Sequence, residues 1–429
     1  MEPIQMPDPS ADDTDNAIDA SAPPPPHLIR REPILDQNRG LAGYRMRVLW
    51  GETPGPDADT GTALIESARQ HGASAFFAYV PHWIDGTPGL LNNAYAHMLP
   101  RHRTYLEFPE TLEVTPELIQ SLQSLAHGGT KFSIRGDLAA DAAREPLLPF
   151  CKVARFDPSL STKADIFRQS FLHKQAGRQL MAVDTPDKAT HDNFMLLGFT
   201  LFQGHWPMDL TSAASLTPRQ KTLLRLVTLI MGEGEAPEIQ ACLQQDPELV
   251  KTLLDMVNTP AFGLSQEVES LNQAIMLLGR KQLQRWIQVL MYTEAGRPAG
   301  YLSPILLQAS ARAHLMEALS NLTHPDQPVR AEAAFTTGIL SIMDQLFQGT
   351  MQDLLAQVNV DVPIREALLR HEGELGLDLR LATLIFPSDR DMEEDPIPLL
   401  QALGVNAEQI DPMIQQAFTW AHAITQAAP

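Results

Sequence analysis

The sequence predicts an α/β barrel of the TIM type followed by an all-α helical bundle. Short strand-like runs alternate with helical stretches over residues 28–207, which is typical of a parallel barrel or a doubly wound sheet. From about residue 215 onward, only apolar residues at helical spacing recur. At 429 residues the chain is long enough for each unit to bury its own core.

The strand candidates of the first unit are short apolar runs. One helix between them is expected at 116–127, because Thr115 can cap it and Pro116 suits its first position. His127-Gly128-Gly129 can end that helix. The predicted strands lie at 44–50, 75–80, 103–108, 131–135, 152–156, 179–183 and 199–202.

Capped starts mark the first helices of the second unit. Thr217-Pro218 and Asp246-Pro247 each open a helix, and Ser270 opens a third that Gly279 is expected to stop. The acidic run 388–398 is expected to be a solvated loop, because it lacks the glycine and the ligand spacing of an EF-hand. Further helices are expected at 281–294, 303–321, 328–347, 363–371, 397–403 and 408–426.

Composition divides the chain into four segments. Residues 1–27 are predicted to be a disordered acidic leader, because six carboxylates precede the first Lys or Arg and Pro23 to Pro26 form a polyproline run. The barrel is expected at 28–208, a linker at 209–216 and the helical domain at 217–429. The short linker predicts that the two units pack together.

Charge and apolar patterning exclude several kinds of partner. The formal net charge of −20 repels a nucleic-acid backbone and anionic lipid, so we expect no nucleic-acid partner and no membrane insertion. The two cysteines, Cys151 and Cys242, lie far apart in apolar contexts and are expected to be buried thiols in a reducing compartment. No apolar run reaches the length of a membrane span and no signal peptide is recognisable, so we expect a cytoplasmic protein.

Three motifs in the first unit resemble the EAL domain family. Arg31-Glu32-Pro33-Ile34 followed by Gly43-Tyr44 is similar to the family start R-Q-P-I and G-Y-E-x-L. The run 106–111 (LEFPET) resembles the L-E-I-T-E block, and 199–204 (FTLFQG) resembles the closing F-x-x-x-Q-G. Their order and spacing over about 175 residues carry the resemblance.

The second unit resembles the HDOD domain. An EAL domain followed by an HDOD domain is a bacterial signalling architecture, and the resemblance covers about 28–390. The residues that carry it are Asp246-Pro247, Leu253-Leu254, Asn258, Phe262-Gly263, Ala274-Ile275, Leu278-Gly279 and Trp286.

The resemblance implies a barrel that has lost its metal-binding carboxylates. Active EAL domains hold paired Mg²⁺ or Mn²⁺ ions with several acids and cleave cyclic di-GMP. The signature glutamate is replaced here by Arg45, and only Glu107 is retained as a candidate ligand. The vestigial site comprises Arg45, Ala78, Glu107, Arg135, Gly136, Lys152, Met181 and Gln203, and the vestigial His-Asp pair of the second unit reads Ser341-Ile342.

Two hypotheses follow for the arginines of the old metal site. In the strand 44–50, Arg45 and Arg47 fall on one face by the two-residue period. Together with Arg135 they can form ion pairs with Glu107 and Glu110 that stabilise the barrel. Alternatively, Arg45, Arg47 and Arg135 form an anion pocket that binds a nucleotide phosphate without metal.

With no metal ligands expected in either unit, the sequence predicts no cofactor, no catalytic residue and no enzymatic activity. The predicted function is a non-catalytic signalling adaptor in cyclic di-GMP-linked signalling, acting on a protein partner through the helical domain. The resemblance associates such proteins with motility and surface attachment (biofilm formation). A homodimer is also consistent with the resemblance, because EAL domains often pair, but the sequence does not decide it.

Two alternatives remain open at this point. The first is a metal-independent receptor for cyclic di-GMP or another nucleotide, which Arg31 and Gln203 favour and Glu32, in place of the family glutamine, disfavours. The second is an active cyclic di-GMP phosphodiesterase, which needs metals that the predicted site cannot hold.

Overall fold

The computed structural model describes most of both predicted units. The described residues are 27–50, 59–72, 76–77, 79–87, 90–91, 99–100, 102–137, 141–185, 187–204, 218–232, 234–258, 267–292, 301–347, 349–358, 360–387 and 394–427. The predicted linker, nearly all of the predicted leader and Ala78 lie outside these residues.

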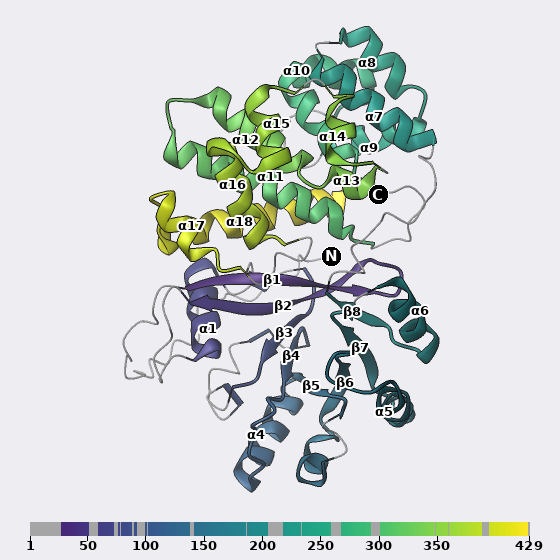
Figure 1. Cartoon of the computed structure of the whole chain (residues 1–429), viewed down its shortest axis with the longest axis vertical. Helices are drawn as coiled ribbons and strands as arrows, with labels where there is room; N and C mark the ends of the chain where they lie inside the picture. The colour runs from purple at the N-terminus through teal and green to yellow at the C-terminus, as the bar shows by residue number, and fades with distance from the viewer. Residues whose placement is uncertain are drawn as a thin grey trace, which may run out of the picture.

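The first unit is a closed eight-stranded barrel within the described chain (Figure 1). From β2 to β8 each strand is parallel to the next, whereas β1 runs antiparallel to both β2 and β8. The barrel is therefore TIM-like but not fully parallel. The strands are β1 (His27–Asp36), β2 (Leu41–Trp50), β3 (His82–Asp85), β4 (Thr104–Glu107), β5 (Lys131–Arg135), β6 (Cys151–Phe156), β7 (Gln179–Val183) and β8 (Leu201–Gln203).

Side chains alternate between the barrel interior and its outer layer, as the two-residue period of a strand requires. Inside, Trp83 stacks on Tyr105 with ring centroids 4.2 Å apart, and Met181 is fully buried. Outside, Phe156 and Phe202 pack in a second apolar cluster under α5 and α6. The helices around the barrel are α1 (Thr60–His71), α4 (Pro116–His127), α5 (Lys163–Gln175) and α6 (Lys188–Leu197), with a 3₁₀ turn at Ala142–Leu147.

The strand predicted at 75–80 is wrong, because the third strand begins after Pro81, at His82. Phe76 and Phe77 are instead buried in the core cluster shared with the helical unit. Downstream, Trp83 and Asp85 alternate into the barrel while His82 faces outward, so the two-residue period starts later than the apolar run suggested. The predictions for β5, β7 and α4 match the observed bounds.

The second unit is all helical in its described residues. Gly279 breaks α10 with φ +64°, which confirms the predicted stop.

The helix predicted at 328–347 is wrong in its second half, since α12 ends at Leu340 and a short α13 follows. The sequence analysis also missed three helices, α8, α14 and α16. The helices are α7 (Pro218–Met231), α8 (Ala236–Leu243), α9 (Pro247–Val257), α10 (Leu271–Leu290), α11 (Pro304–Thr323), α12 (Pro328–Leu340), α13 (Met343–Leu346), α14 (Met351–Leu355), α15 (Val362–Arg370), α16 (Gly373–Ile385), α17 (Ile397–Ala402) and α18 (Ala407–Ala427).

The helical unit packs on the β1–β2 side of the barrel (Figure 1). One apolar cluster runs through both, joining Leu35 of β1 to Leu307 of α11 and Phe418 of α18. The backbone N–H of Leu41 also donates to the carbonyl of Leu302 at 3.0 Å. The two units are therefore in direct contact, as the short linker predicts.

Candidate functional site

The candidate site lies inside the barrel at the carboxyl ends of the parallel strands, where the loops meet. Arg45 of β2 reaches across to two carboxylates. Its Nη2 lies 2.6 Å from Asp85 Oδ1 of β3, and its Nη1 lies 3.3 Å from Glu107 Oε2 of β4. Arg155 of β6 contacts the same Glu107 oxygen at 2.7 Å. Side chains from four strands thus form one ion-pair network.

Burial sets the electrostatics of this network. Glu107 is 9% exposed, and burial raises its pKa to about 7 against the opposing charge of Arg45. Burial alone lowers the pKa of Arg45, but Glu107 and Asp85 more than offset this and raise it. The guanidinium therefore stays charged between two acids, where a metal-binding barrel would place a cation.

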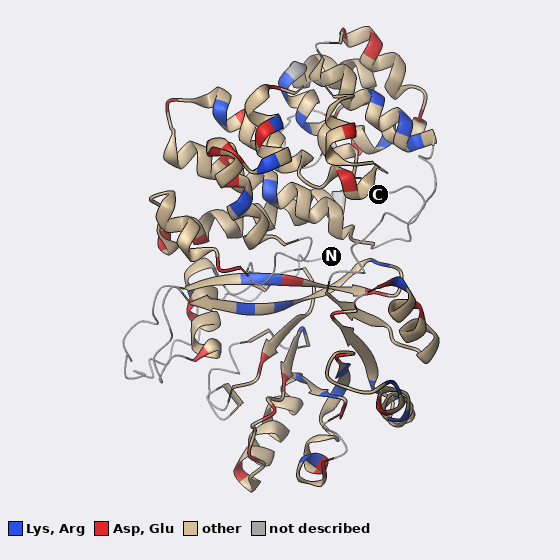
Figure 2. Cartoon of the chain, viewed as in Figure 1, with Lys and Arg blue, Asp and Glu red and all other residues tan. Residues whose placement is uncertain are grey.

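A second group of charges lies on β1, β2 and β8. Glu32 accepts from Arg47 Nε at 3.0 Å and from Gln203 Nε2 at 3.0 Å. Arg30 Nη2 lies 3.6 Å from the Glu32 oxygen that Arg47 contacts, so two guanidiniums share one carboxylate oxygen. Figure 2 shows Lys and Arg residues on neighbouring stretches of β1 and β2.

Arg135 belongs to a separate group at the end of β5. Its guanidinium pairs with Asp137 at 2.6 Å and with Glu110. The structure thus brings Arg45 to Glu107 and Arg135 to Glu110, whereas Arg47 meets Glu32. Each of the three arginines proposed for an anion pocket already contacts at least one acid.

Several residues of the predicted vestigial site do not reach the mouth. Lys152 is exposed on β6, and Met181 is buried in the apolar interior beside Val153 and Leu201. Gly136 follows β5, where an added Cβ would lie 2.2 Å from the Phe156 ring. Ala78 is outside the described residues.

Two mouth residues were missed by the sequence analysis. Asp85 and Arg155 each lie two residues beyond an inward apolar residue, Trp83 and Val153. That two-residue spacing was the available signal. Asp85 was overlooked because the third strand was assigned too early in the chain.

The mouth does not fit a two-metal centre. The described residues contain no group of three or more His, Cys, Asp or Glu side chains placed to hold a metal ion. Asp85 and Glu107 are partners across the β3–β4 ladder, but Arg45 already bridges them. A divalent ion there would have to displace a buried guanidinium.

An arginine also contacts Ser341, one of the two residues predicted to form the vestigial His-Asp position of the helical unit. Arg312 of α11 is 1% exposed, and its Nη1 donates to Ser341 Oγ at 3.2 Å. Its Nε donates to the carbonyl of Phe386 at 2.9 Å. Ile342 beside Ser341 is buried and apolar. These contacts join α11, the end of α12 and the end of α16.

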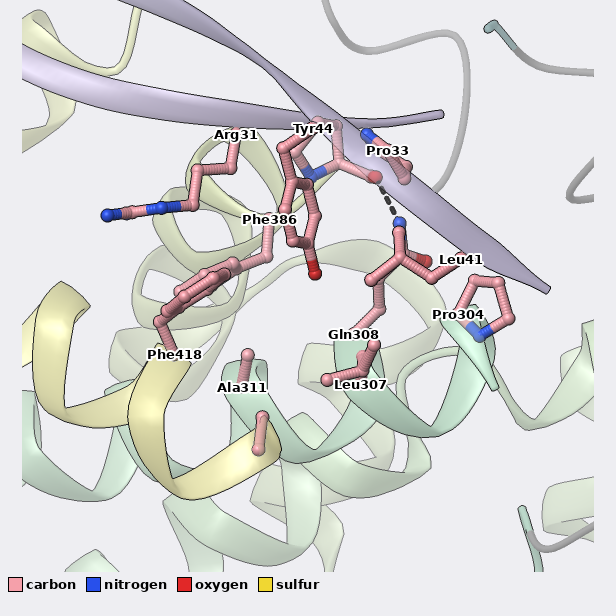
Figure 3. Close-up of a pocket in the computed structure, with 12 residues that line it drawn as sticks. Arg31, Pro33, Leu41, Tyr44, Pro304, Leu307, Gln308, Ala311, Phe386 and Phe418 are labelled. Atoms are coloured by element: carbon pink, nitrogen blue, oxygen red, sulfur yellow. Dashed lines mark hydrogen bonds between the residues drawn. The ribbon is translucent and has the colours of Figure 1, made fainter. Parts of the chain in front are cut away.

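A small cavity lies where the barrel meets the helical unit (Figure 3). Arg31 and Tyr44 line it from the barrel, and Gln308 and Phe418 line it from α11 and α18. Its volume of about 20 Å³ suits a water molecule and is too small for a nucleotide. The cavity is therefore a feature of domain packing.

Comparisons with known proteins agree with the predicted two-part layout. Residues 219–372 match the HDOD domain family, so the C-terminal part of the chain contains an HDOD domain. Over 93% of its own length and 93% of the relative's, the chain is 25% identical to a protein of Vibrio cholerae named cyclic di-GMP phosphodiesterase CdgJ. It is 23% identical to "Uncharacterized protein YuxH" of Bacillus subtilis, covering 85% of this chain and 91% of that one.

Solved EAL structures are similar to the barrel part at a low level. An EAL domain protein of Listeria monocytogenes aligns over 42% of this chain and 85% of its own, with 14% identity and a TM-score of 0.33. The structure titled "PaMucR Phosphodiesterase, c-di-GMP complex" covers 42% of this chain and 93% of its own, with 18% identity and a TM-score of 0.34. No described helix combines the length and apolar composition that crossing a membrane requires.

One prediction needs correction. The sequence predicts that the chain is not an enzyme, and this is contradicted by the relative of matching length that carries the name of a phosphodiesterase. The prediction rested on the lost metal ligands alone, and the ion pairs of the mouth do not by themselves decide activity.

We expect Glu107→Ala to lower the free energy of unfolding by about 3 kcal/mol, because it leaves Arg155 and Arg45 buried with less compensation. Glu110→Ala is the matched control: this carboxylate pairs with Arg135 but its side chain is 60% exposed, so we expect a change below about 1 kcal/mol. Urea unfolding of both variants measures the difference. Equal effects would contradict a structural role for the buried network.

Acid is expected to destabilise the domain junction through His82. This side chain is 0% exposed, and burial, with Arg31, His422 and Arg103 nearby, lowers its pKa from 6.5 to about 3. Between these values the unfolded chain binds the proton and the native state does not, so stability falls as pH falls below 6.5. Its contribution from pH 6.5 to 5 is about 1.5 kcal/mol.

Unfolding of His82→Gln across this pH range measures that contribution. We expect a shallower loss of stability than in the wild type, with part of the slope remaining because burial also lowers the pKa of His422 to about 3. His127→Gln, on the exposed end of α4, serves as the control. A slope unchanged by His82→Gln would rule out the buried neutral histidine.

Proposed function

We propose that this chain is a regulator in cyclic di-GMP signalling that recognises the nucleotide at the barrel mouth and responds through its HDOD domain. A relative named cyclic di-GMP phosphodiesterase spans 93% of both chains, which supports the same nucleotide here. The HDOD match over residues 219–372 supports a signalling role for the helical part. Whether the nucleotide is a ligand or also a substrate is decided by the experiment below.

The observation that carries the proposal is the arginine pair on β1 and β2. Arg30 is 5% exposed, and its Nε and Nη1 have no hydrogen-bond partner within the described chain. Arg47 beside it has a half-exposed side chain, and both depend on the single carboxylate of Glu32. Phosphate oxygens would satisfy such donors without a metal ion. Arg45 and Arg135, which each hold two carboxylates, are less available.

The output is proposed to be a contact with a protein partner. The helical domain offers exposed apolar residues, such as Met276 and Leu277 on α10, that a partner can cover. A role in motility or surface attachment, in the cytoplasm, remains part of this proposal. The support for this role is the order of the domains, in which a barrel that resembles nucleotide-binding EAL domains precedes a helical domain suited to binding a protein.

Calorimetric titration with cyclic di-GMP tests the proposal, in buffers with Mg²⁺ and with EDTA. We expect binding in both, and we expect Arg47→Gln to weaken it at least about tenfold, since charge-assisted bonds to phosphate contribute about 1.5–3 kcal/mol each. Arg69→Gln is the control, because among the described residues this exposed arginine forms an ion pair with Glu66 of α1 alone. No heat in either buffer would overturn nucleotide recognition.

Hydrolysis is followed in the same samples by separating nucleotide and products, with and without Mn²⁺. Product formation above the protein-free rate would show that the nucleotide is a substrate as well as a ligand. Glu107→Gln then tests whether the mouth is responsible, because this substitution keeps the side-chain volume and removes the charge. Activity unchanged in this variant would place the reaction elsewhere.

A homodimer through α5 and α6 is a further part of the proposal. Phe167 and Phe171 are 63% and 57% exposed, one turn apart on α5, and Leu196 of α6 is 85% exposed. α5 and α6 contact each other and both lie on the outside of the barrel (Figure 1), so these exposed apolar residues can form one surface. A second copy can bury it with the two phenylalanines facing their equivalents across a two-fold axis.

Sedimentation velocity tests this interface. We expect the wild type to sediment as a dimer at micromolar concentration and the double substitution Phe167→Ser and Phe171→Ser to sediment as a monomer. Val329→Ser, which removes a 75% exposed side chain from α12, serves as the matched control and should leave the dimer intact. A monomeric wild type would remove the dimer from the proposal.

A further inference from the structure

The last helix, α18, presents a stripe of polar and aromatic residues to the barrel. Asp411, Gln415, Phe418 and His422 recur at spacings of four, three and four residues, which places them on one face of the helix. All are buried. Apolar residues on another face, such as Ile414 and Ala417, belong to the core, and α18 packs against α11. The helix therefore has separate faces for the two domains.

Each residue of the stripe contacts the barrel. Asp411 Oδ2 lies 2.6 Å from His71 Nε2 at the end of α1. Gln415 Oε1 accepts from Arg31 Nη2 of β1 at 2.9 Å. The His422 Nε2 lies 3.2 Å from the Tyr44 hydroxyl of β2. The helix lies outside residues 219–372, which match the HDOD family.

Arg31 is the centre of the contact. Its guanidinium carbon lies 4.2 Å from the centroid of Phe418 and 4.8 Å from that of Phe76 (Figure 3 shows Arg31 over Phe418). The side chain is 4% exposed, and within the described residues no carboxylate lies within ion-pair distance of it. Its charge is thus held by two aromatic rings, the side-chain oxygen of Gln415 and the backbone carbonyl of Phe76.

Several buried polar atoms of this contact have no hydrogen-bond partner within the described chain. They are Arg31 Nε and Nη1, both ring nitrogens of His82, Asp411 Oδ1, Gln415 Nε2 and His422 Nδ1. Each such atom would regain a water partner if the surfaces separated. The contact also contains residues of the shared apolar core, such as Phe76, Leu307 and Phe418, so these polar atoms lower the cost of separation without removing it.

The same two strands carry the barrel mouth on their other face. Glu32 follows Arg31, and Arg45 follows Tyr44, so each outward residue has an inward neighbour. Glu32 and Arg45 are partners across the β1–β2 ladder. A shift of these strands caused by a change in the mouth therefore moves the residues that hold α18.

We propose that the barrel docks reversibly on α18, and that the ion pairs of the mouth on β1 and β2 set how tightly it docks. This inference rests on the proposed function in one respect: α18 is the element that would carry the response from the barrel mouth to the HDOD domain. Release exposes Arg31, Tyr44 and the stripe of α18, whereas docking covers them. The two states thus differ in which surface reaches solvent.

Thiol accessibility measures the docked fraction. Ala421→Cys introduces a thiol at a position that is 1% exposed and lines the cavity between α18 and the barrel. The native thiols of Cys151 in the barrel and Cys242 in α8 are also buried and report global opening of each domain. The rate at which a maleimide labels each of the three thiols is measured by mass spectrometry. Gln308→Cys on α11 lines the same cavity and replaces the first position if that variant does not fold.

Two mouth substitutions are compared in this background. Arg45→Gln removes two ion pairs on β2, and Arg135→Gln removes two on β5, away from α18. We expect Arg45→Gln to raise the labelling rate of the introduced thiol at least about fivefold while both native thiols keep their rates. We expect Arg135→Gln to change none of the three. An unchanged introduced thiol in Arg45→Gln, or all three thiols accelerating together, would overturn the proposal.

Cyclic di-GMP added to the same background separates this inference from the proposed function. A changed labelling rate at the introduced thiol alone supports both. If the nucleotide neither binds nor alters labelling but Arg45→Gln does, the proposed nucleotide recognition fails and the coupling between mouth and α18 stands. Labelling that responds to the nucleotide in the wild type but not to Arg45→Gln would assign the response to a route other than the ion pairs.

Discussion

The bridge that Arg45 makes between Asp85 and Glu107 is the constraint on which the barrel mouth depends. Carboxylates at the ends of neighbouring parallel strands repel each other unless a cation lies between them. A guanidinium supplies that cation covalently, in a fixed plane, and it cannot be lost to a chelator or exchanged for another ion. Arg155 adds a second contact to Glu107, so the acids that face the barrel axis are neutralised by the chain itself.

Strands β1 and β2 connect the ion pairs of the mouth to the contact between the barrel and the helical domain. β1 is antiparallel to both of its neighbours. Its outer face packs toward α11 and α18, while its inner face joins the mouth. Glu32 holds Arg47 and Gln203 on one side, and Arg31 lies between Phe76 and Phe418 on the other. The consecutive residues Arg31 and Glu32 therefore belong to two different networks, since Glu32 is part of the ionic one and Arg31 of the aromatic one. A rearrangement of either network moves strand β1.

The sequence predicted what local chemistry determines. The helix α4 was predicted to the residue because Thr115, Pro116 and the following glycines mark both ends. Arg45 was expected near Glu107 because the two-residue period of a strand places it inward. The pairing of Arg47 with Glu32 depends on strand register and on which strands are neighbours, which the pattern within one strand does not contain. The two-residue period could have placed Asp85 and Arg155 inward, but the carboxylate and guanidinium that they meet also depend on strand order. The third strand was misplaced for the same reason, since Phe76 and Phe77 are drawn into a core that the helical domain completes.

Both domains have a buried arginine where the sequence analysis predicts a lost metal site. Arg45 stands at the position predicted for the signature acid of the barrel, and Arg312 contacts Ser341 of the predicted vestigial His-Asp pair. In both places the arginine joins separate elements of the fold: β2 to β3 and β4 in one, α11 to the ends of α12 and α16 in the other. A metal centre links elements only while the ion is bound, whereas these links are permanent. The buried contact of α18 with the barrel is held less completely, because several of its polar atoms have no hydrogen-bond partner in the described chain, so a change of state is expected at this surface.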